Sequence, residues 1–375
     1  MRALILGAAF FLAANAPRSD TAQLALHLRA VRAYKALPSG YYSPIRAEYL
    51  AWIDSRVKAR ESLADMRAEL QAAGILAKPA SEPTTEMYRS YVGYVEPPGE
   101  SQIRGGEDVF AIEAAVYRNA SCGLDATEIL YDKKTLDRLG WVNGELSKSD
   151  YPFYNSSPAV GEQDASGARV VASGWVISNC TSTWNGKSIR IDRLDRNSNV
   201  NLLSRGISAH DRDGTSVATW VRGDTVTFFY SGGLQDLDLL ETPSIARYRI
   251  AGGRAIHESP IALTRAGFIN EWLTLKDVNP SDYATAEAVA VRAKTDLALR
   301  KGISQWQSVA RCPGAPPVLE IAIRVDKPPQ NIVFRISGER ASQLRMVGIA
   351  AKLTPGCNPI GVSNGLETIS AELPW

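Results

Sequence analysis

Residues 216–230 read SVATWVRGDTVTFFY, and this stretch decides the fold class. Two runs, Ser216–Val221 and Thr225–Tyr230, are rich in β-branched and aromatic residues, which favour strands. Between them lies Arg222-Gly223-Asp224, which supplies the glycine that tight hairpin turns favour. The stretch therefore predicts two antiparallel strands joined by a short turn.

The same two-residue period continues on both sides of this hairpin. Leu319, Ile321 and Ile323 alternate with Glu320 and Arg324, which indicates a strand with one wet face. The pattern predicts further strands at 109–117, 168–178, 188–194, 245–250, 332–336 and 344–349.

These strands predict an α+β, β-rich chain. Residues 109–375 are expected to form a large antiparallel β domain, sandwich-like or two-sheet, with a helical insert near 263–301. A β-propeller is less favoured, because residues 109–257 would hold three blades at most.

A small helical part is expected before the β domain, at residues 17–77. Its apolar residues recur at helical spacing, and Ser62 with Asp65 three residues later resembles a capping box. Residues 78–108 are rich in Pro, Ser, Thr and Gly, which predicts a linker or a long loop.

Residues 1–16 have the layout of a secretory signal peptide. Arg2 precedes an apolar run from Ala3 to Ala14, and Ala14-Asn15-Ala16 fits a small-residue cleavage site. Pro17 is unfavourable directly after a cut, so the exact cleavage point stays open, and a buried N-terminal helix is the alternative. We expect an exported protein, periplasmic or extracellular.

Composition excludes several classes of protein. The 375 residues carry 42 basic and 40 acidic side chains, a net charge of +2, and this balance argues against a nucleic-acid partner. No run of 18 apolar residues occurs, so no transmembrane span is expected.

The cysteine count suits an exported chain. Cys122, Cys180, Cys312 and Cys357 follow the leader, and an even number predicts two disulfides with three possible connectivities. We favour the sequential pairing, Cys122 with Cys180 and Cys312 with Cys357; the alternative is four free, buried thiols. No pair is spaced C-x-x-C, so neither a zinc site nor a thioredoxin-type site is expected.

Two stretches supply weak catalytic candidates. His210, Asp211 and Asp213 bring a histidine and carboxylates together, which suits acid–base or metal chemistry. The alternative is an ordinary turn, because short polar side chains bond their own backbone. Asp236 and Asp238 share one face if residues 234–240 form a strand, and paired carboxylates serve glycoside hydrolysis.

Other motif matches lack their partners. Gly361–Gly365 reads G-x-S-x-G, but no histidine or aspartate follows it. His257 and Glu258 are adjacent in a predicted strand, so they face opposite sides. With neither G-x-G-x-x-G nor a P-loop in the sequence, no cofactor is expected.

Four aromatic residues are candidates for stacking on a ligand: Trp175, Trp184, Trp220 and Tyr230. Exposed rings in a groove would suit a sugar or a peptide, and the alternative is that they fill the core. We expect an exported protein of the bacterial envelope, a non-enzymatic binding or structural accessory, whose partner is an envelope protein or a glycan. The alternative is a hydrolase of a cell-envelope polymer that uses the His/Asp or paired-Asp residues.

Overall fold

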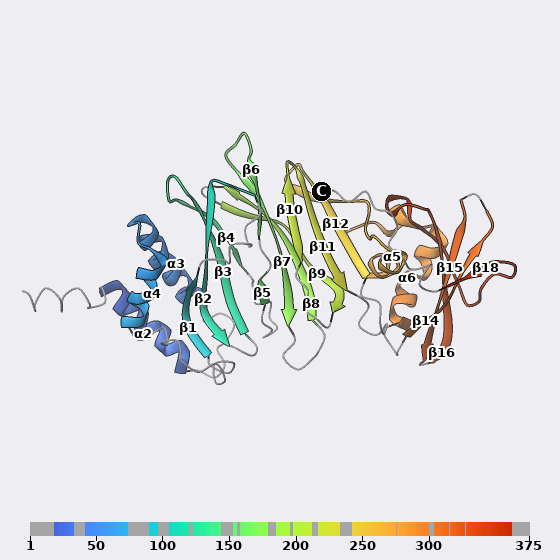
Figure 1. Ribbon diagram of the computed structural model, residues 1–375, viewed down its shortest axis with the longest axis horizontal. Coiled ribbons are helices and arrows are strands. Elements are labelled where there is room, and N and C mark those ends of the chain that lie inside the picture. Colours follow the sequence, from blue (N-terminus) through green and yellow to red (C-terminus); the bar gives the residue numbers. More distant parts are fainter. Residues whose placement is uncertain are drawn as a thin grey trace, which may run out of the picture. The chain divides into compact units, whose positions relative to one another are not determined.

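The computed structural model of the protein (Figure 1) describes most of the chain after residue 18. The described residues are 19–33, 42–73, 90–96, 105–119, 123–143, 153–155, 158–178, 185–195, 198–211, 217–232, 242–274, 276–299, 304–314, 316–326 and 328–361. They form a β-rich fold of antiparallel sheets with a small helical N-terminal part, which confirms the predicted fold class. The strands of the described residues are arranged in four sheets.

The chain divides into two compact units. Unit 1 spans Met1–Arg169, Ile177–Thr181 and Arg193–Val200. Unit 2 spans Val170–Val176, Ser182–Asp192 and Asn201–Trp375.

The described residues of unit 1 begin with three helices that pack on one sheet (Figure 1). The helices are α2 (Ser19–Ala33), α3 (Tyr42–Lys58) and α4 (Leu63–Ala72), and α4 starts with the predicted capping box of Ser62 and Asp65. The sheet has the order β1-β2-β3-β4, with β1 (Ser90–Glu96), β2 (Val109–Asn119), β3 (Gly123–Asp132) and β4 (Arg138–Asn143). The core of the unit lies between these two layers, where Trp52 and Ile53 meet Ile112 and Ile129.

Strand β1 lies inside the range that composition predicts to be a linker or long loop. Its residues pair with β2 in antiparallel register, for example Tyr94 with Ala115. The prediction of a linker or long loop is therefore wrong for residues 90–96. The flanking prolines and glycines indicate a loop, but the edge of β2 supplies the hydrogen-bond partners that make these residues a strand.

A buried arginine joins the three helices of unit 1. The guanidinium of Arg56 donates to Asp20 of α2 (2.9 Å) and to Glu69 of α4 (3.0 Å). It also donates to the hydroxyl of Thr21 (2.9 Å) and lies over the ring of Trp52. This charge is buried with several partners, as a buried guanidinium requires.

The next strands form a sheet of order β5-β7-β8-β9, with β6 paired to β7. Their bounds are β5 (Phe153–Asn155), β6 (Ala159–Gln163), β7 (Arg169–Ser178), β8 (Asn185–Asp195) and β9 (Ser198–Asp211).

A four-stranded meander follows in unit 2, and it contains the hairpin predicted from residues 216–230. Its strands are β10 (Ala218–Arg222), β11 (Thr225–Gly232), β12 (Thr242–Ala251) and β13 (Arg254–Glu258), in that order. Arg222 pairs with Thr225, and Gly223 has a φ of 57° in the two-residue turn between them.

The last part of unit 2 is a helical layer on a five-stranded sheet (Figure 1). The predicted insert appears as α5 (Arg265–Thr274), the 3-10 helix η2 (Pro280–Tyr283) and α6 (Ala286–Leu299). The sheet has the order β17-β16-β15-β14-β18. Its elements are β14 (Ser304–Cys312), β15 (Val318–Asp326), β16 (Pro329–Ser337), the 3-10 helix η3 (Ala341–Gln343), β17 (Arg345–Ala350) and β18 (Asn358–Ile360).

The core of this part combines residues of the helical layer and of the sheet. Phe268, Ile269 and Trp272 of α5 pack against the buried faces of β15 and β16. None of the described helices is both long and apolar enough to cross a membrane.

Candidate functional site

An apolar crevice in unit 1 is the candidate binding site. It has a volume of about 240 Å³ and is bordered by the α3–α4 loop, the first turn of α4, strand β2 and the β3–β4 turn. The lining residues are Val57, Arg60, Glu61, Leu63, Met66, Phe110, Ala111, Ile112 and Leu136. Predominantly apolar walls with a few polar groups are typical of ligand pockets.

The end of helix α3 positions Arg60 at the crevice. The amide of Glu61 donates to the carbonyl of Arg56 (3.0 Å), and the amide of Arg60 donates to the carbonyl of Val57 (2.9 Å). This is the Schellman pattern, in which the residue after the C-cap adopts a left-handed backbone. Arg60 occupies that position with a φ of 58°. Glycine is favoured there because it has no Cβ, so the chain keeps an arginine side chain at an energetic cost.

The β3–β4 turn positions Leu136 on another wall. The carboxylate of Asp132 accepts hydrogen bonds from the amides of Thr135 and Lys134, both at 2.8 Å. These backbone hydrogen bonds, that of Thr135 foremost, lower the pKa of Asp132. The amide of Leu136 donates to the carbonyl of Asp132 (2.9 Å), and Leu136 has a φ of 59°. The turn therefore holds a leucine in a conformation that favours glycine.

Both strained residues belong to the same crevice. Among the described residues, Arg60 and Leu136 are the two that have a positive φ without being glycine. A left-handed backbone costs an L-residue about 1–2 kcal/mol. Strain of this kind concentrates at binding and catalytic sites. This coincidence is the reason why we take the crevice as the candidate site.

The crevice carries one unpaired positive charge. Arg60 is exposed, and within the described ranges its guanidinium has no hydrogen-bond or ion-pair partner. The other charged lining residue, Glu61, has its Oε2 3.7 Å from the Nε of the buried Arg56. The nearby carboxylate of Asp65 belongs to the capping box of α4.

A second group of polar side chains is buried in unit 2. Arg205 of β9 donates to Glu271 of α5 (3.0 Å) and to the hydroxyl of Tyr248 on β12 (2.9 Å). The hydroxyl of Tyr248 donates in turn to Asp277 (2.5 Å), and the hydroxyl of Tyr230 on β11 donates to Glu271 (2.7 Å). These five residues are called the arginine cluster below.

Glu271 is the most enclosed member of the arginine cluster. Its side chain is 1% exposed, and each of its two oxygens already accepts a hydrogen bond. Burial raises the pKa of Glu271, while Arg205 and Tyr230 act in the opposite direction. A carboxylate held in this way is closed to substrate and water, so it joins α5 to β9 and β11 instead of offering a free acid or base.

His257 borders the arginine cluster without joining its hydrogen bonds. Its ring packs edge-on against Tyr248, with the ring centroids 4.9 Å apart. Both ring nitrogens are buried and have no hydrogen-bond partner in the described part of the chain. Burial lowers the pKa of His257 to about 4; Asp277 raises it and Arg205 lowers it further. The adjacent Glu258 pairs with Arg249 instead, so the two residues face opposite sides as predicted.

Sequence reasoning missed the arginine cluster, apart from Tyr230. Arg205 and Glu271 are 66 residues apart, so no local pattern connects them. A usable signal was present in α5, where the acid Glu271 follows Asn270 between the apolar pairs Phe268-Ile269 and Trp272-Leu273. A buried acid in such a position requires a partner.

The aromatic stacking candidates have different outcomes. Tyr230 is 0% exposed and bonded to Glu271, so it is a core residue and offers no face to a ligand. Trp220 is half-buried on β10. The side chains of Trp175 and Trp184 lie outside the described residues.

The side chains of the weak catalytic candidates lie outside the described residues. His210 and Asp211 are the last two residues of β9, and their side chains lie outside the described residues. Asp213, Asp236 and Asp238 lie wholly outside them. A His/Asp or paired-Asp site therefore stays a prediction.

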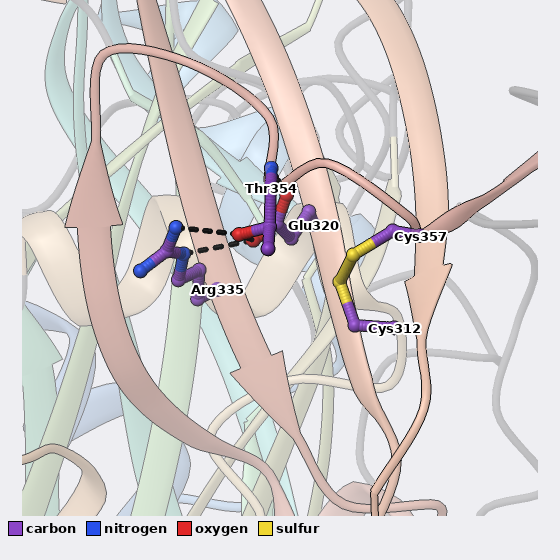
Figure 2. The surroundings of a disulfide bond; sticks show 5 residues. All are labelled: Cys312, Glu320, Arg335, Thr354 and Cys357. Carbon is purple, nitrogen blue, oxygen red and sulfur yellow. Dashed lines mark hydrogen bonds and ion pairs between the residues drawn. A yellow bond between two sulfur atoms is a disulfide. The ribbon is translucent and has the colours of Figure 1, made fainter.

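One predicted disulfide is present. Cys312 at the end of β14 is bonded to Cys357, which confirms that pairing (Figure 2). Cys122 and Cys180 lie outside the described residues, so their pairing stays a prediction.

Glu320 lies beside this disulfide and has the geometry of a third metal ligand. Its carboxylate is already taken, because it accepts from Arg335 (2.8 Å) and from the amide of Thr354 (2.7 Å) (Figure 2). The sulfurs are bonded to each other, so this group fastens the loop before β18 to the sheet.

Comparison with known proteins gives little. No protein-family model and no curated protein matches this chain. A GH43 endo-arabinanase from Bacillus licheniformis is similar over 67% of this chain and 100% of its own, with 9% identity and a TM-score of 0.17. A likeness of that size carries no argument about fold or function.

Proposed function

We propose that the protein is an exported, non-enzymatic binding protein of the bacterial envelope, and that the crevice of unit 1 is its binding site. The observation that carries the proposal is the pair of strained residues. Arg60 and Leu136 both keep a side chain on the crevice where glycine would cost less.

Export is supported by two features of the chain. Residues 1–16 have the signal-peptide layout, although they lie outside the described residues. The bond between Cys312 and Cys357 is of a kind that persists in oxidising compartments.

A binding role is supported by the difference between the arginine cluster of unit 2 and the crevice of unit 1. In unit 2 the carboxylate of Glu271 is enclosed and saturated, so it acts as a fastening group. In unit 1 the crevice has apolar walls and one unpaired charge, which suits reversible binding of an apolar body.

The test is calorimetric titration of the mature protein with 1-octanol, a neutral eight-carbon probe. Burying such a chain contributes about 0.8 kcal/mol per CH₂ before the cost of association. We expect saturable binding at one site with a Kd of roughly 0.1–1 mM.

Two variants locate that site. Leu63→Trp places a larger side chain in the crevice and is expected to weaken octanol binding at least tenfold, by occupying the space. Leu297→Trp is the matched control on the exposed surface of α6 and leaves binding unchanged. Equal binding by both variants, or no saturable binding at all, refutes the crevice as the binding site.

A further inference from the structure

We propose that the ligand of the crevice is a medium-chain carboxylic acid, whose carboxylate pairs with Arg60 while about eight to ten carbon atoms fill the apolar space. This inference rests on the proposed function, because it names the ligand class of the same site. It combines the size of the crevice with the position of its unpaired charge.

The size limits the apolar body. An apolar cavity of about 150 Å³ holds a benzene molecule, which has six carbon atoms. The crevice, at about 240 Å³, is larger by a factor of about 1.6. It therefore suits about ten non-hydrogen atoms, which excludes a complete long-chain lipid and fits a short alkyl chain.

The charge determines the head group. Arg60 lines the crevice and is the cation there without a partner among the described side chains. Its basic neighbour Lys58 already pairs with Asp137. A planar guanidinium binds a carboxylate through two parallel hydrogen bonds, so an anionic head is complementary to this rim.

The backbone separates a ligand role for Arg60 from a structural one. The Schellman position needs a left-handed residue, and glycine fulfils that need at lower cost. The Arg60 side chain is exposed and has no hydrogen-bond or ion-pair partner among the described residues, so no polar contact fastens it to the α3–α4 loop.

The first experiment compares octanoate with 1-octanol at pH 7 by calorimetric titration of the mature protein. The two probes share the chain and differ in the head. We expect octanoate to bind three- to tenfold more tightly, and the difference to shrink as salt is added, because the ion pair lies at the surface. A peptide with a free C-terminal leucine is titrated in parallel.

Variants at Arg60 complete the test. Arg60→Gly is expected to raise the melting temperature, because the strain is released, and to abolish the preference for octanoate. Arg60→Lys keeps the charge and is expected to retain part of the preference. Arg254→Gln, at an exposed arginine of unit 2, is the control and changes neither property.

The outcomes separate the two proposals. If octanol and octanoate bind equally and Arg60→Gly changes the affinity for neither probe, the proposed ligand class is wrong, but the proposal that the crevice is the binding site is not contradicted. If the peptide binds and octanoate does not, the ligand class is also wrong. If Arg60→Gly lowers the melting temperature, the residue has a structural role and the inference fails. If no probe binds, the proposed function fails first.

Discussion

The two helical layers of this chain close on their sheets in opposite ways. In unit 2, every residue of α5 from Ala266 to Leu273 is buried. In unit 1, the helices bury one face on the sheet but leave a crevice of about 240 Å³ beside the α3–α4 loop. Both layers are helices packed on antiparallel strands, so the difference lies in the side chains and not in the architecture.

In unit 2, helix α5 is buried over almost its whole length. The apolar face of α5 packs on β15 and β16, and Glu271 on the same helix is satisfied by Arg205 and Tyr230. A buried carboxylate with all its partners fixes the elements around it. In unit 1 the strain at Arg60 and Leu136 accompanies an opening instead. We therefore expect the closed layer to contribute stability, whereas the proposed binding site belongs to the open layer.

The largest loss in the free energy of unfolding is expected from Glu271→Gln, which removes a buried charge from the closed layer. The change leaves the buried guanidinium of Arg205 without its enclosed carboxylate, and breaking a buried ion pair costs about 3–5 kcal/mol. Urea unfolding measures this loss. Glu287→Gln, at an exposed site on α6, should cost less than about 1 kcal/mol. Equal losses in the two variants would show that the arginine cluster does not fasten the layer.

A smaller, pH-dependent effect is expected from His257, which borders the same cluster. Its pKa is lowered from 6.5 to about 4 in the folded protein. Below pH 6.5 the His257 ring is protonated in the unfolded chain, whereas in the folded protein it is protonated only below about pH 4. The contribution of this group is therefore fully present above pH 6.5 and falls between pH 6.5 and 4, by up to about 3 kcal/mol.

His257→Phe tests this sign. The variant keeps an aromatic ring against Tyr248 and removes the two unpartnered nitrogens. We expect the free energy of unfolding to depend less on pH between 6.5 and 4, as measured by urea titration at each pH. Ile256→Gln, at an exposed neighbour, should keep the original slope. An unchanged slope in His257→Phe would place the acid sensitivity elsewhere.

The smallest effect is expected from Leu136→Gly in the open layer. Release of the left-handed strain returns about 1–2 kcal/mol, which offsets most of the apolar contact that is lost. The net change in the free energy of unfolding should stay within about 1 kcal/mol. Leu130→Gly, at a fully buried strand position, should cost more than about 3 kcal/mol. Similar losses at both positions would refute the strain at Leu136.

Predictions from sequence succeeded where the cause is local. The hairpin at 216–230 and the capping box of Ser62 each depend on residues within a few positions. Strand β1 was missed because its partner β2 lies beyond the prolines that suggested a loop.

Most of the candidate site and of the buried charges could not be predicted from the sequence. Arg56 is buried with Asp20 and Glu69, which are 36 and 13 residues away in the sequence, so no local pattern predicts its burial. The only feature of the sequence that points to Arg60 is that the position after the C-cap of α3 is not a glycine. The aromatic Tyr230 was noticed, but its burial against Glu271 was not predictable from its own strand.

The sequence by itself determined the β-rich class, the helical insert and the capping box of Ser62, because periodicity and turn chemistry act over short distances. It favoured the pairing of Cys312 with Cys357 among three connectivities, and the structure decided it. Only the tertiary structure decided which charges are enclosed and where the crevice opens. Those properties depend on contacts between residues tens of positions apart, such as Arg205 with Glu271, and on backbone angles such as the φ of Leu136. Local sequence patterns specify neither of these.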